Sequence, residues 1–554
     1  MTSMDGRATG RLYGVGLGPG DPELVTVKAV RLIERAAVVA YHSARHGRSV
    51  ARAIAAPYLR AGQVEEAFTY PVTTETTDHP GGYRGAIEEF YADCAARLAA
   101  HLDAGRDVVV LCEGDPFFYG SYMHMHKRLA GRYEAEVVPG VTSVSAASAV
   151  LGRPLVERDE VLTVLPGTLP PEALAERLAG TDSAAVLKLG RTFGGVREAL
   201  AEAGRLDEAW YVERATGDRQ RVAPLAEVDP ASVPYFSLAL LSSRVHERTR
   251  AELAGPVASA VAGSVASAVA GAAVAERSGG GPAEPATEPG GEPSGTAQEP
   301  GGEPGGRGEV LVVGLGPAGR DWLTPQAQAA LAGADDLVGY GPYLDRVPAN
   351  PRQRRHASDN RVEAERAEFA LALAGRGRRV AVVSSGDPGV FAMAAAVLEV
   401  ATEPRWKDIP VRVLPGLTAA QAVASRVGAP LGHDYCVLSL SDRLKPWEVI
   451  AERLTAAARA DLVIAIYNPG SKSRTWQVAA ARDLLLEHRS PETPVVLGRD
   501  VGGDDERVRV VRLADLDPAD VDMRTLLLVG SSTTRVAARG GGDQVVFTPR
   551  RYPA

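Results

Sequence analysis

Three short motifs combine glycine, proline and small polar residues in patterns that suit contact with a small ligand. The run GVGLGPG occupies 14–20, a Gly-Asp-Pro turn lies at 114–116, and VPGVTS follows at 138–143. Glycine lets the backbone take positive φ values and approach a ligand closely. Thr or Ser at a helix start either caps the helix or meets a ligand there. Each motif taken alone is also explained by an ordinary turn or cap.

All three motifs occur a second time, in the same order. VVGLGPA at 312–318 repeats the glycine-rich run, SSGDP at 384–388 repeats the Gly-Asp-Pro turn, and LPGLTA at 414–419 repeats the third motif. Three ordered matches indicate an internal duplication. The repetition favours a ligand site in each half over three unrelated turns.

A dinucleotide site is the rival interpretation of the glycine-rich run. Pro19 and Pro317 stand inside the two loops, where a phosphate cradle needs free N–H donors. The acidic residue expected about 20 residues further on is also missing, because 36–40 reads AAVVA. A tandem dinucleotide-dependent oxidoreductase therefore stays as the alternative enzyme.

Strands alternating with helices must position these motifs. The valine-rich runs at 108–111 and 380–383 are typical of buried parallel strands, and a helical stretch begins after each Gly-Asp-Pro turn. The pattern predicts an α/β fold in both halves. Ligands of such sheets bind at the carboxyl ends of the strands, where all three motifs fall.

The composition changes sharply after about residue 250. Residues 278–308 are rich in Gly, Pro and Glu and lack aromatic side chains, which predicts a flexible linker. The uncharged run 253–275 is long enough to cross a membrane, but it consists of Ala, Val, Gly and Ser, so we interpret it as a tether. We expect domains at 11–248 and 308–537, a disordered linker at 249–307 and a C-terminal tail at 538–554.

Charge and cysteine content narrow the function classes. The net charge of −8 over 554 residues argues against non-specific nucleic-acid binding. Three scattered cysteines exclude a disulfide framework and fit a reducing cytoplasm. The first eleven residues lack the apolar core of an export signal. We therefore expect a cytoplasmic protein with no membrane and no nucleic-acid partner.

At the level of whole motifs, both halves resemble the tetrapyrrole C-methyltransferases of cobalamin biosynthesis. In the first half, CEGDPFFYGSY (112–122), VVPGVTSVSAAS (137–148) and YVERATGDRQ (211–220) are similar to precorrin-2 C20-methyltransferases. In the second half, VGYGPYLDR (338–346) and AIYNPGSKSRTWQ (465–477) are similar to precorrin-3B C17-methyltransferases. The resemblance spans nearly everything outside the linker and the ends.

The resemblance implies two tandem units, each built from two α/β subdomains, with one S-adenosylmethionine in the cleft of each unit. It implies that the first cofactor site uses Pro19, Glu113, Gly114, Asp115, Thr142, Ser143, Leu189 and Ala215. It implies that the second uses Pro317, Ser385, Gly386, Asp387, Thr418, Ala419, Tyr467 and Asn468. Two positions depart from the family pattern: Ala318 replaces a glycine, and 498–502 stands where the first half has the ERAT segment.

The implied function is bifunctional methylation of precorrin-2 at C20 and of the next macrocycle at C17 with ring contraction, in metal-free or cobalt form. One active half beside a non-catalytic half, or a relative that methylates RNA or protein, is the remaining alternative. The tetrapyrrole substrates are polycarboxylates, for which arginine is the natural partner. Candidate substrate-binding residues are Arg45, His46, Arg48, Arg352, Arg354 and Arg355.

No residue constellation identifies a catalytic acid, base or nucleophile, and none predicts a metal site. The pairs His42/His46 and His124/His126 are better explained as solvated or packed side chains. Relatives of this kind usually form homodimers, so we expect either a homodimer or pairing of the two halves within one chain.

Overall fold

The computed structural model describes residues 9–45, 47–72, 77, 79–157, 160–243, 308–359, 362–443, 445–471, 474–538 and 544–549. The predicted linker at 249–307 and the uncharged run at 253–275 lie outside these residues. Within the described part of the chain, no helix is both long enough and apolar enough to cross a membrane.

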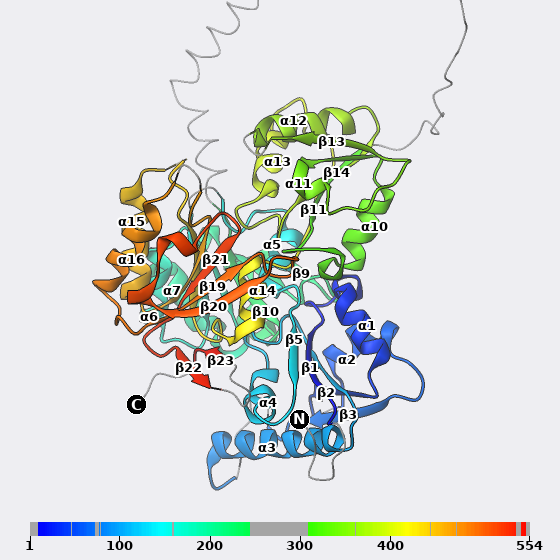
Figure 1. Cartoon of the computed structure of the whole chain (residues 1–554), viewed down its shortest axis with the longest axis vertical. Coiled ribbons are helices and arrows are strands. Elements are labelled where there is room, and N and C mark those ends of the chain that lie inside the picture. The colour runs from blue at the N-terminus through cyan, green and yellow to red at the C-terminus, as the bar shows by residue number, and fades with distance from the viewer. Residues whose placement is uncertain are drawn as a thin grey trace, which may run out of the picture. The chain divides into compact units, whose positions relative to one another are not determined.

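The first half begins with a five-stranded parallel sheet (Figure 1). Its strands, in spatial order, are β3 (Val64–Thr69), β2 (Val38–Ser43), β4 (Val108–Cys112), β1 (Leu12–Gly16) and β5 (Ala135–Val138). Alternate residues of these strands pack on opposite faces. Helices α1 (Val27–Arg35) and α2 (Val50–Ala55) cover one face, and α3 (Gly82–Asp103) and α4 (Tyr122–Leu129) cover the other.

The second half repeats this layered subdomain with the same strand order. The strands are β13 (Arg354–Ser358), β12 (Asp336–Tyr340), β14 (Arg379–Ser384), β11 (Glu309–Gly314) and β15 (Val411–Leu414). Helices α10 (Pro325–Gly333) and α11 (Gly341–Leu344) pack on one face, and α12 (Glu363–Ala374) and α13 (Met393–Ala401) on the other. The predicted duplication is therefore present in the fold itself.

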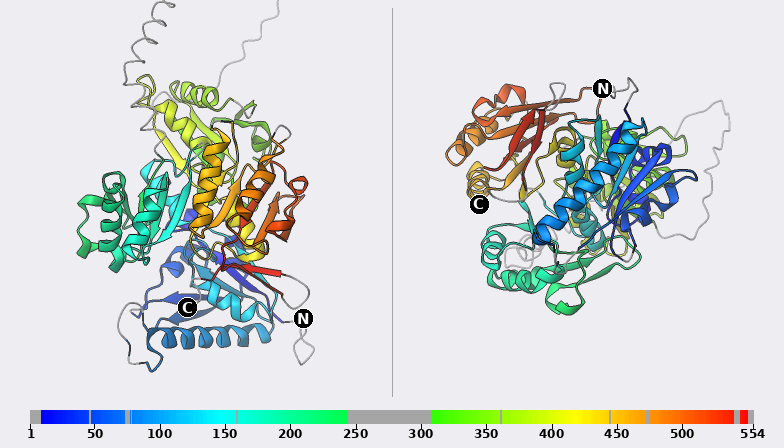
Figure 2. Two further views of the ribbon diagram at one scale, coloured as in Figure 1. Left: turned by 90° about the vertical axis from the view of Figure 1, so that its left-hand side faces the viewer. Right: turned by 90° about the horizontal axis from the view of Figure 1, so that it is seen from below.

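The second subdomains of both halves share one ten-stranded sheet (Figures 1 and 2). The first half contributes β6 (Leu162–Pro166), β7 (Ser183–Leu187), β10 (Ser237–Leu241), β8 (Trp210–Glu213) and β9 (Arg221–Pro224). The second half contributes β17 (Tyr435–Ser439), β18 (Val463–Tyr467), β21 (Thr525–Val529), β19 (Pro494–Arg499) and β20 (Arg507–Arg512). Antiparallel pairing of β6 with β17 joins the two sets at the centre.

Helices cover both faces of the shared sheet. One face packs against α6 (Pro171–Ala179) and α7 (Phe193–Glu202) and, in the second half, against α15 (Trp447–Arg459) and α16 (Gln477–Leu486). The other face packs in a single hydrophobic core against α5 (Ser143–Leu151) and α14 (Ala419–Val427). Because that core contains side chains from both halves, its burial stabilises their association.

Ion pairs reinforce the junction between the halves. Arg177 lies 3.2 Å from Asp434, and Arg453 lies 3.0 Å from Asp182; each pair joins one half to the other. Asp434 is only 3% exposed, so its pairing with an arginine offsets the cost of burying a carboxylate.

The segment 538–554, expected to be a tail, contains a paired strand. Strand β23 (Gln544–Phe547) pairs with β22 (Arg535–Ala538) and with the short strand β16 (Gly428–Ala429). Phe547 packs against the core of the first subdomain, and the Lys127 ammonium lies 5.2 Å from its ring centroid. Val546 of this strand is buried, with Val545 and Phe547 partly buried on either side of it.

Candidate active sites

In each half the glycine-rich loop and the Gly-Asp-Pro turn are joined by a pair of main-chain hydrogen bonds. The N–H of Gly18 donates to the carbonyl of Gly114 at 3.3 Å, and the N–H of Gly114 donates back at 2.8 Å. Gly316 and Gly386 make the same exchange in the second half, at 3.1 and 2.9 Å. The structure thus brings together the loops that carry Pro19 and Pro317 and the two Gly-Asp-Pro turns.

The aspartate of each turn organises the loops. Asp115 accepts hydrogen bonds from the N–H groups of Phe117, at 2.8 Å, and of Gly140, at 3.1 Å. Asp387 accepts an equivalent pair at 2.8 and 3.1 Å. Both side chains are 4% exposed, and burial raises the pKa of Asp115 to about 7 and of Asp387 to about 6. These carboxyls therefore tie the turn to the third motif.

The glycines of the motifs serve two different purposes. A Cβ on Gly140 would lie 2.1 Å from the carbonyl oxygen of Gly114, so this glycine permits close packing of one loop on another. Gly114 and Gly386 instead have φ values of +64° and +68°, and a Cβ there would meet nothing nearer than 4.0 and 3.8 Å. They leave an open face on the turn, where backbone groups can meet a ligand. The turn of each half therefore has room for a ligand beside its glycine.

The third motif begins a helix beside each turn. Thr142 caps α5 by accepting a hydrogen bond from the N–H of Ser145 at 3.3 Å, and Thr418 caps α14 in the same way. Ser143 and Ala419 are the first residues of these helices and are partly exposed. Capping is what both threonines do in the structure, and it aims the N-terminal N–H groups of α5 and α14 at the loops.

Of the two predicted residues from the second subdomain, Ala215 and Leu189, one lies beside the glycine-rich loop of the first site and the other is buried in a core. The carbonyl of Ala215 lies 2.9 Å from where a Cβ on Gly20 would stand, and the N–H of Asp21 donates to the Thr216 hydroxyl at 3.1 Å. Ala215 is therefore adjacent to the glycine-rich loop. Leu189 is fully buried in the core beneath α6 and α7, so its side chain serves packing.

In the second site, Tyr467 contacts the start of α14. Its hydroxyl accepts a hydrogen bond from the N–H of Ala420 at 3.1 Å, while Asn468 donates to the Ser439 hydroxyl at 3.1 Å. Residues 498–502, which take the place of the ERAT segment, pack beside the glycine-rich loop of the second half. A Cβ on Gly502 would lie 2.6 Å from the indole nitrogen of Trp322.

Strained backbone marks equivalent positions in both halves. Lys188 and Asn468 follow β7 and β18, with φ values of +63° and +48°. Arg214 and Asp500 follow β8 and β19, with φ values of +47° and +51°. Non-glycine residues with positive φ are uncommon and cluster at functional sites. Their recurrence at corresponding strand ends shows that these loops have the same backbone shape in both halves.

The two sites differ in charge at the residue before the open glycine. Glu113 of the first site accepts a hydrogen bond from the N–H of Ala51 at 3.2 Å. Burial raises the pKa of Glu113 to about 7, against an opposing effect of the Arg214 charge. The second site has Ser385 at this position.

Sequence patterns did not single out two residues that contact these loops. Arg346 bonds to both loops of the second site, and Ser145 of the first half donates a hydrogen bond to Asp387 of the second half. Arg346 ends the run VGYGPYLDR, which was a usable signal. The contact of Ser145 depends on how the halves pack, for which the sequence carried no signal.

The candidate substrate-binding residues show mixed placements. Arg45 and Arg48 are exposed on the loop after β2, and His46 lies outside the described residues. Arg352 and Arg354 are exposed at the start of β13. The guanidinium of Arg355 donates to three nearby main-chain carbonyls, so its fork is already engaged.

The histidines pack with aromatic side chains. His42 stacks on Tyr70, and His124 stacks on Tyr91 with ring centroids 4.2 Å apart. Burial lowers the pKa of His42 to about 4. Among the residues that the structure describes, no group of three or more His, Cys, Asp or Glu side chains is arranged to hold a metal ion.

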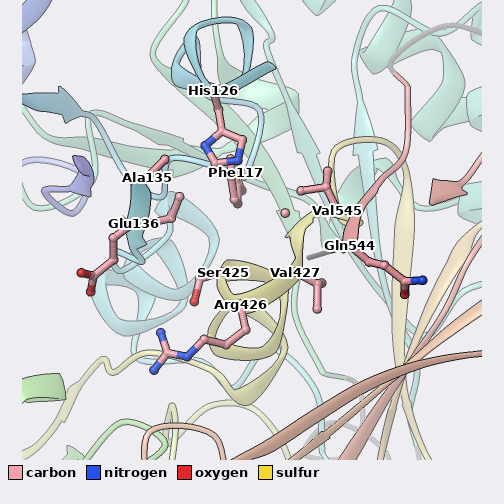
Figure 3. Close-up of a pocket in the computed structure, with 11 residues that line it drawn as sticks. Phe117, His126, Ala135, Glu136, Ser425, Arg426, Val427, Gln544 and Val545 are labelled. Atoms are coloured by element: carbon pink, nitrogen blue, oxygen red, sulfur yellow. The ribbon is translucent and has the colours of Figure 1, made fainter. Parts of the chain in front are cut away.

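Two pockets lie between the halves. One, of about 160 Å³, is lined by Phe117 and His126 of the first half and by Arg426, Gln544 and Val545 of the second (Figure 3). It contains none of the predicted cofactor residues. A smaller cavity of about 20 Å³ is lined by residues of both predicted sites. Its lining includes Thr142, Ser145, Thr418, Gln421 and Tyr467.

Comparison with known proteins agrees with this duplicated architecture. The family model described as tetrapyrrole (corrin/porphyrin) methylases matches twice, at residues 11–229 and 309–517. The cobalamin biosynthesis protein CobIJ of Mycobacterium tuberculosis is 58% identical over 550 residues, covering 99% of this chain and 97% of that protein.

Single-unit relatives match one half each. A precorrin-3B C(17)-methyltransferase of Sinorhizobium sp is 49% identical over 247 residues, covering 44% of this chain and 97% of that protein. A precorrin-2 C(20)-methyltransferase of Sinorhizobium sp is 51% identical over 239 residues, covering 43% of this chain and 97% of that protein. With two family matches and a full-length relative, the chain belongs to the tetrapyrrole (corrin/porphyrin) methylases.

Proposed function

We propose that the chain is a bifunctional S-adenosylmethionine-dependent C-methyltransferase of corrin synthesis. Residues 11–248 methylate precorrin-2 at C20, and residues 308–537 methylate the next macrocycle at C17 with ring contraction, in metal-free or cobalt form. The observation that carries this proposal is the separate match of the two single-unit relatives, which are named for these two reactions. Each of them is matched over 97% of its length.

We propose one cofactor per half, in the cleft where the three motifs meet. When bound, S-adenosylmethionine supplies an electrophilic methyl group, and an electron-rich carbon of the macrocycle takes it as the carbon–sulfur bond breaks. The chain has to align the two partners and exclude water. The open faces of Gly114 and Gly386 and the helix starts at Ser143 and Ala419 would bind and orient the cofactor.

We infer that the two halves pair within one chain as two copies pair in a homodimer. The β6–β17 pairing, the shared core and the two ion pairs between halves support this inference. We also infer a cytoplasmic location, since Cys94, Cys112 and Cys436 are all free and buried.

Calorimetric titration with S-adenosylhomocysteine, the demethylated product, tests the cofactor assignment. Wild-type protein is expected to bind two equivalents. Asp115→Ala should weaken one equivalent and Asp387→Ala the other, because each change deprives two buried N–H groups of their acceptor. No binding at all would refute the methyltransferase proposal and favour the oxidoreductase. A single equivalent would favour one non-catalytic half.

Product analysis tests the substrates. Incubation with S-adenosylmethionine and precorrin-2, with and without cobalt, is expected to add one methyl group at C20, followed by a second at C17 once the intermediate is in the required oxidation state. The Asp387→Ala variant should stop after the first methyl group. A product methylated elsewhere would refute the assignment of the two reactions.

A further inference from the structure

The guanidinium of Arg346 lies at the junction of the two loops that form the second cofactor site. Its Nη1 donates to the Ser385 hydroxyl at 3.0 Å. Its Nη2 donates to the carbonyls of Gly316, at 2.7 Å, and of Leu315, at 3.2 Å, and also to that of Ala318. One side chain thus bridges the glycine-rich loop and the Gly-Asp-Pro turn.

The place of Arg346 in the fold explains these contacts. Arg346 follows α11, which covers the sheet at the end of β12. The main-chain N–H of Arg346 donates to the carbonyl of Tyr343 at 3.2 Å. Three main-chain carbonyls that converge on one point repel each other electrostatically. A planar cation with several donors satisfies all of them at once and keeps the loop in this conformation.

The first half has a different residue at this place in the turn. Glu113 occupies the position of Ser385, and it accepts a hydrogen bond from Ala51 in α2, the helix that corresponds to α11. The residue that faces this position from the second subdomain also differs. The charge of Arg214 acts on Glu113, whereas the charge of Asp500 acts on Arg346.

We propose that Arg346 is a positioning residue of the second cofactor site, which it forms by fastening the glycine-rich loop to Ser385. The two sites consequently differ in the ionisable group beside the turn, which is the Glu113 carboxyl in the first and the Arg346 guanidinium in the second. This inference rests on the proposed function only in taking the two clefts as cofactor sites.

The test compares Arg346→Gln with Arg489→Gln in the full-length chain. Arg489 is a matched control, because its buried guanidinium also donates to three carbonyls of the second half, those of Ala457, Leu462 and Gly530. Those carbonyls belong to the second subdomain and not to the cofactor loops. A third variant, Arg346→Lys, keeps the positive charge but loses the planar fork.

Amide hydrogen exchange measures directly whether Arg346 holds the two loops together. Arg346→Gln is expected to speed exchange in peptides covering 312–319 and 384–389 and to leave 12–20 and 112–117 unchanged. Arg489→Gln should leave all four peptides unchanged. Unaltered exchange at 312–319 in Arg346→Gln would overturn the proposal, whether or not the chain binds the cofactor.

Titration with S-adenosylhomocysteine reports the consequence for the site. Arg346→Gln should weaken one of the two equivalents by roughly 10- to 100-fold, the loss expected for hydrogen bonds from a charged donor. Arg346→Lys should give an intermediate loss, and Arg489→Gln should keep both affinities even if it lowers the melting temperature. Equal weakening of both equivalents would indicate a general structural role and overturn the proposal. Wild-type protein that binds no S-adenosylhomocysteine would refute the proposed function, while the exchange measurement still decides the role of Arg346.

Discussion

Replacement of Glu113 by Gln should make the chain more stable, and the gain should depend on pH. The ordinary pKa of this carboxyl is 4.5, and burial raises it to about 7 in the folded chain. The folded state therefore holds the proton more tightly than the unfolded state does. Below about pH 4.5 Glu113 is protonated in both states, so no charge is buried on folding and the folding free energy carries no penalty from it. As the pH rises to 7 the cost grows, and above pH 7 it is complete.

The size of this effect follows from the shift in pKa. It corresponds to about 3 kcal/mol of folding free energy above pH 7. This is an upper limit, because Glu113 is only half-buried and water screens its charge. Gln keeps an oxygen that accepts from the Ala51 N–H but does not ionise. The two halves share one sheet and one core, so they should unfold together. An unfolding entropy of about 2 cal/mol/K per residue gives about 1 °C per kcal/mol for a unit of this size. The melting temperature should therefore rise by up to about 3 °C at pH 8 and hardly change at pH 5.

Scanning calorimetry between pH 5 and pH 8 measures this difference. Glu227→Gln, which changes an exposed carboxylate in the same half, is the control. The other carboxyls of raised pKa in the described part of the chain, Asp115, Asp387 and Asp434, are present in both variants and cancel in the comparison. Melting curves of Glu113→Gln and wild type that stay parallel across the pH range would refute the argument that burial governs this group.

Two further predictions concern single loop contacts. Gly114→Ala should cost about 1 kcal/mol, from its positive φ alone, because a Cβ there meets nothing nearer than 4.0 Å. Gly140→Ala should be far more destabilising, since its Cβ would lie 2.1 Å from a carbonyl oxygen. Urea denaturation measures the free energy of unfolding of both variants. Equal losses of stability would contradict the packing argument. Tyr467→Phe removes the acceptor of the Ala420 N–H and should weaken S-adenosylhomocysteine at the second site by about tenfold, with the first site unchanged in the same titration.

The fold class was predictable from the sequence because the valine-rich strands and the motifs that follow them are local signals. The runs at 108–111 and 380–383 lie in the predicted strands β4 and β14, and each Gly-Asp-Pro turn follows its strand. The order of the motifs showed the duplication, and the structure repeats it strand by strand. What the sequence lacked was any signal for the pairing of β6 with β17, which depends on contacts between distant segments.

The sequence predicted which motifs come together, and the structure joins their loops by main-chain hydrogen bonds. Which of their side chains contact a cofactor stays a prediction. Asp115 accepts hydrogen bonds from its own loops and Thr142 caps α5, while their contact with the cofactor stays a prediction. Leu189 packs in a core. A motif shows that a residue type is required at a position but does not distinguish a ligand contact from a contact that shapes the loop. That distinction requires the hydrogen-bond partners.

Comparison of the halves separates these two kinds of residue. The groups that are identical in both halves, such as Asp115 and Asp387, bond to the protein's own backbone and give the loops one shape. The groups that differ, Glu113 and Ser385 above all, stand directly before the open glycine. A shared loop shape suits the cofactor that we propose for each half. The residues that differ give each site its own chemistry beside that shared loop, so two reactions can proceed on one duplicated scaffold.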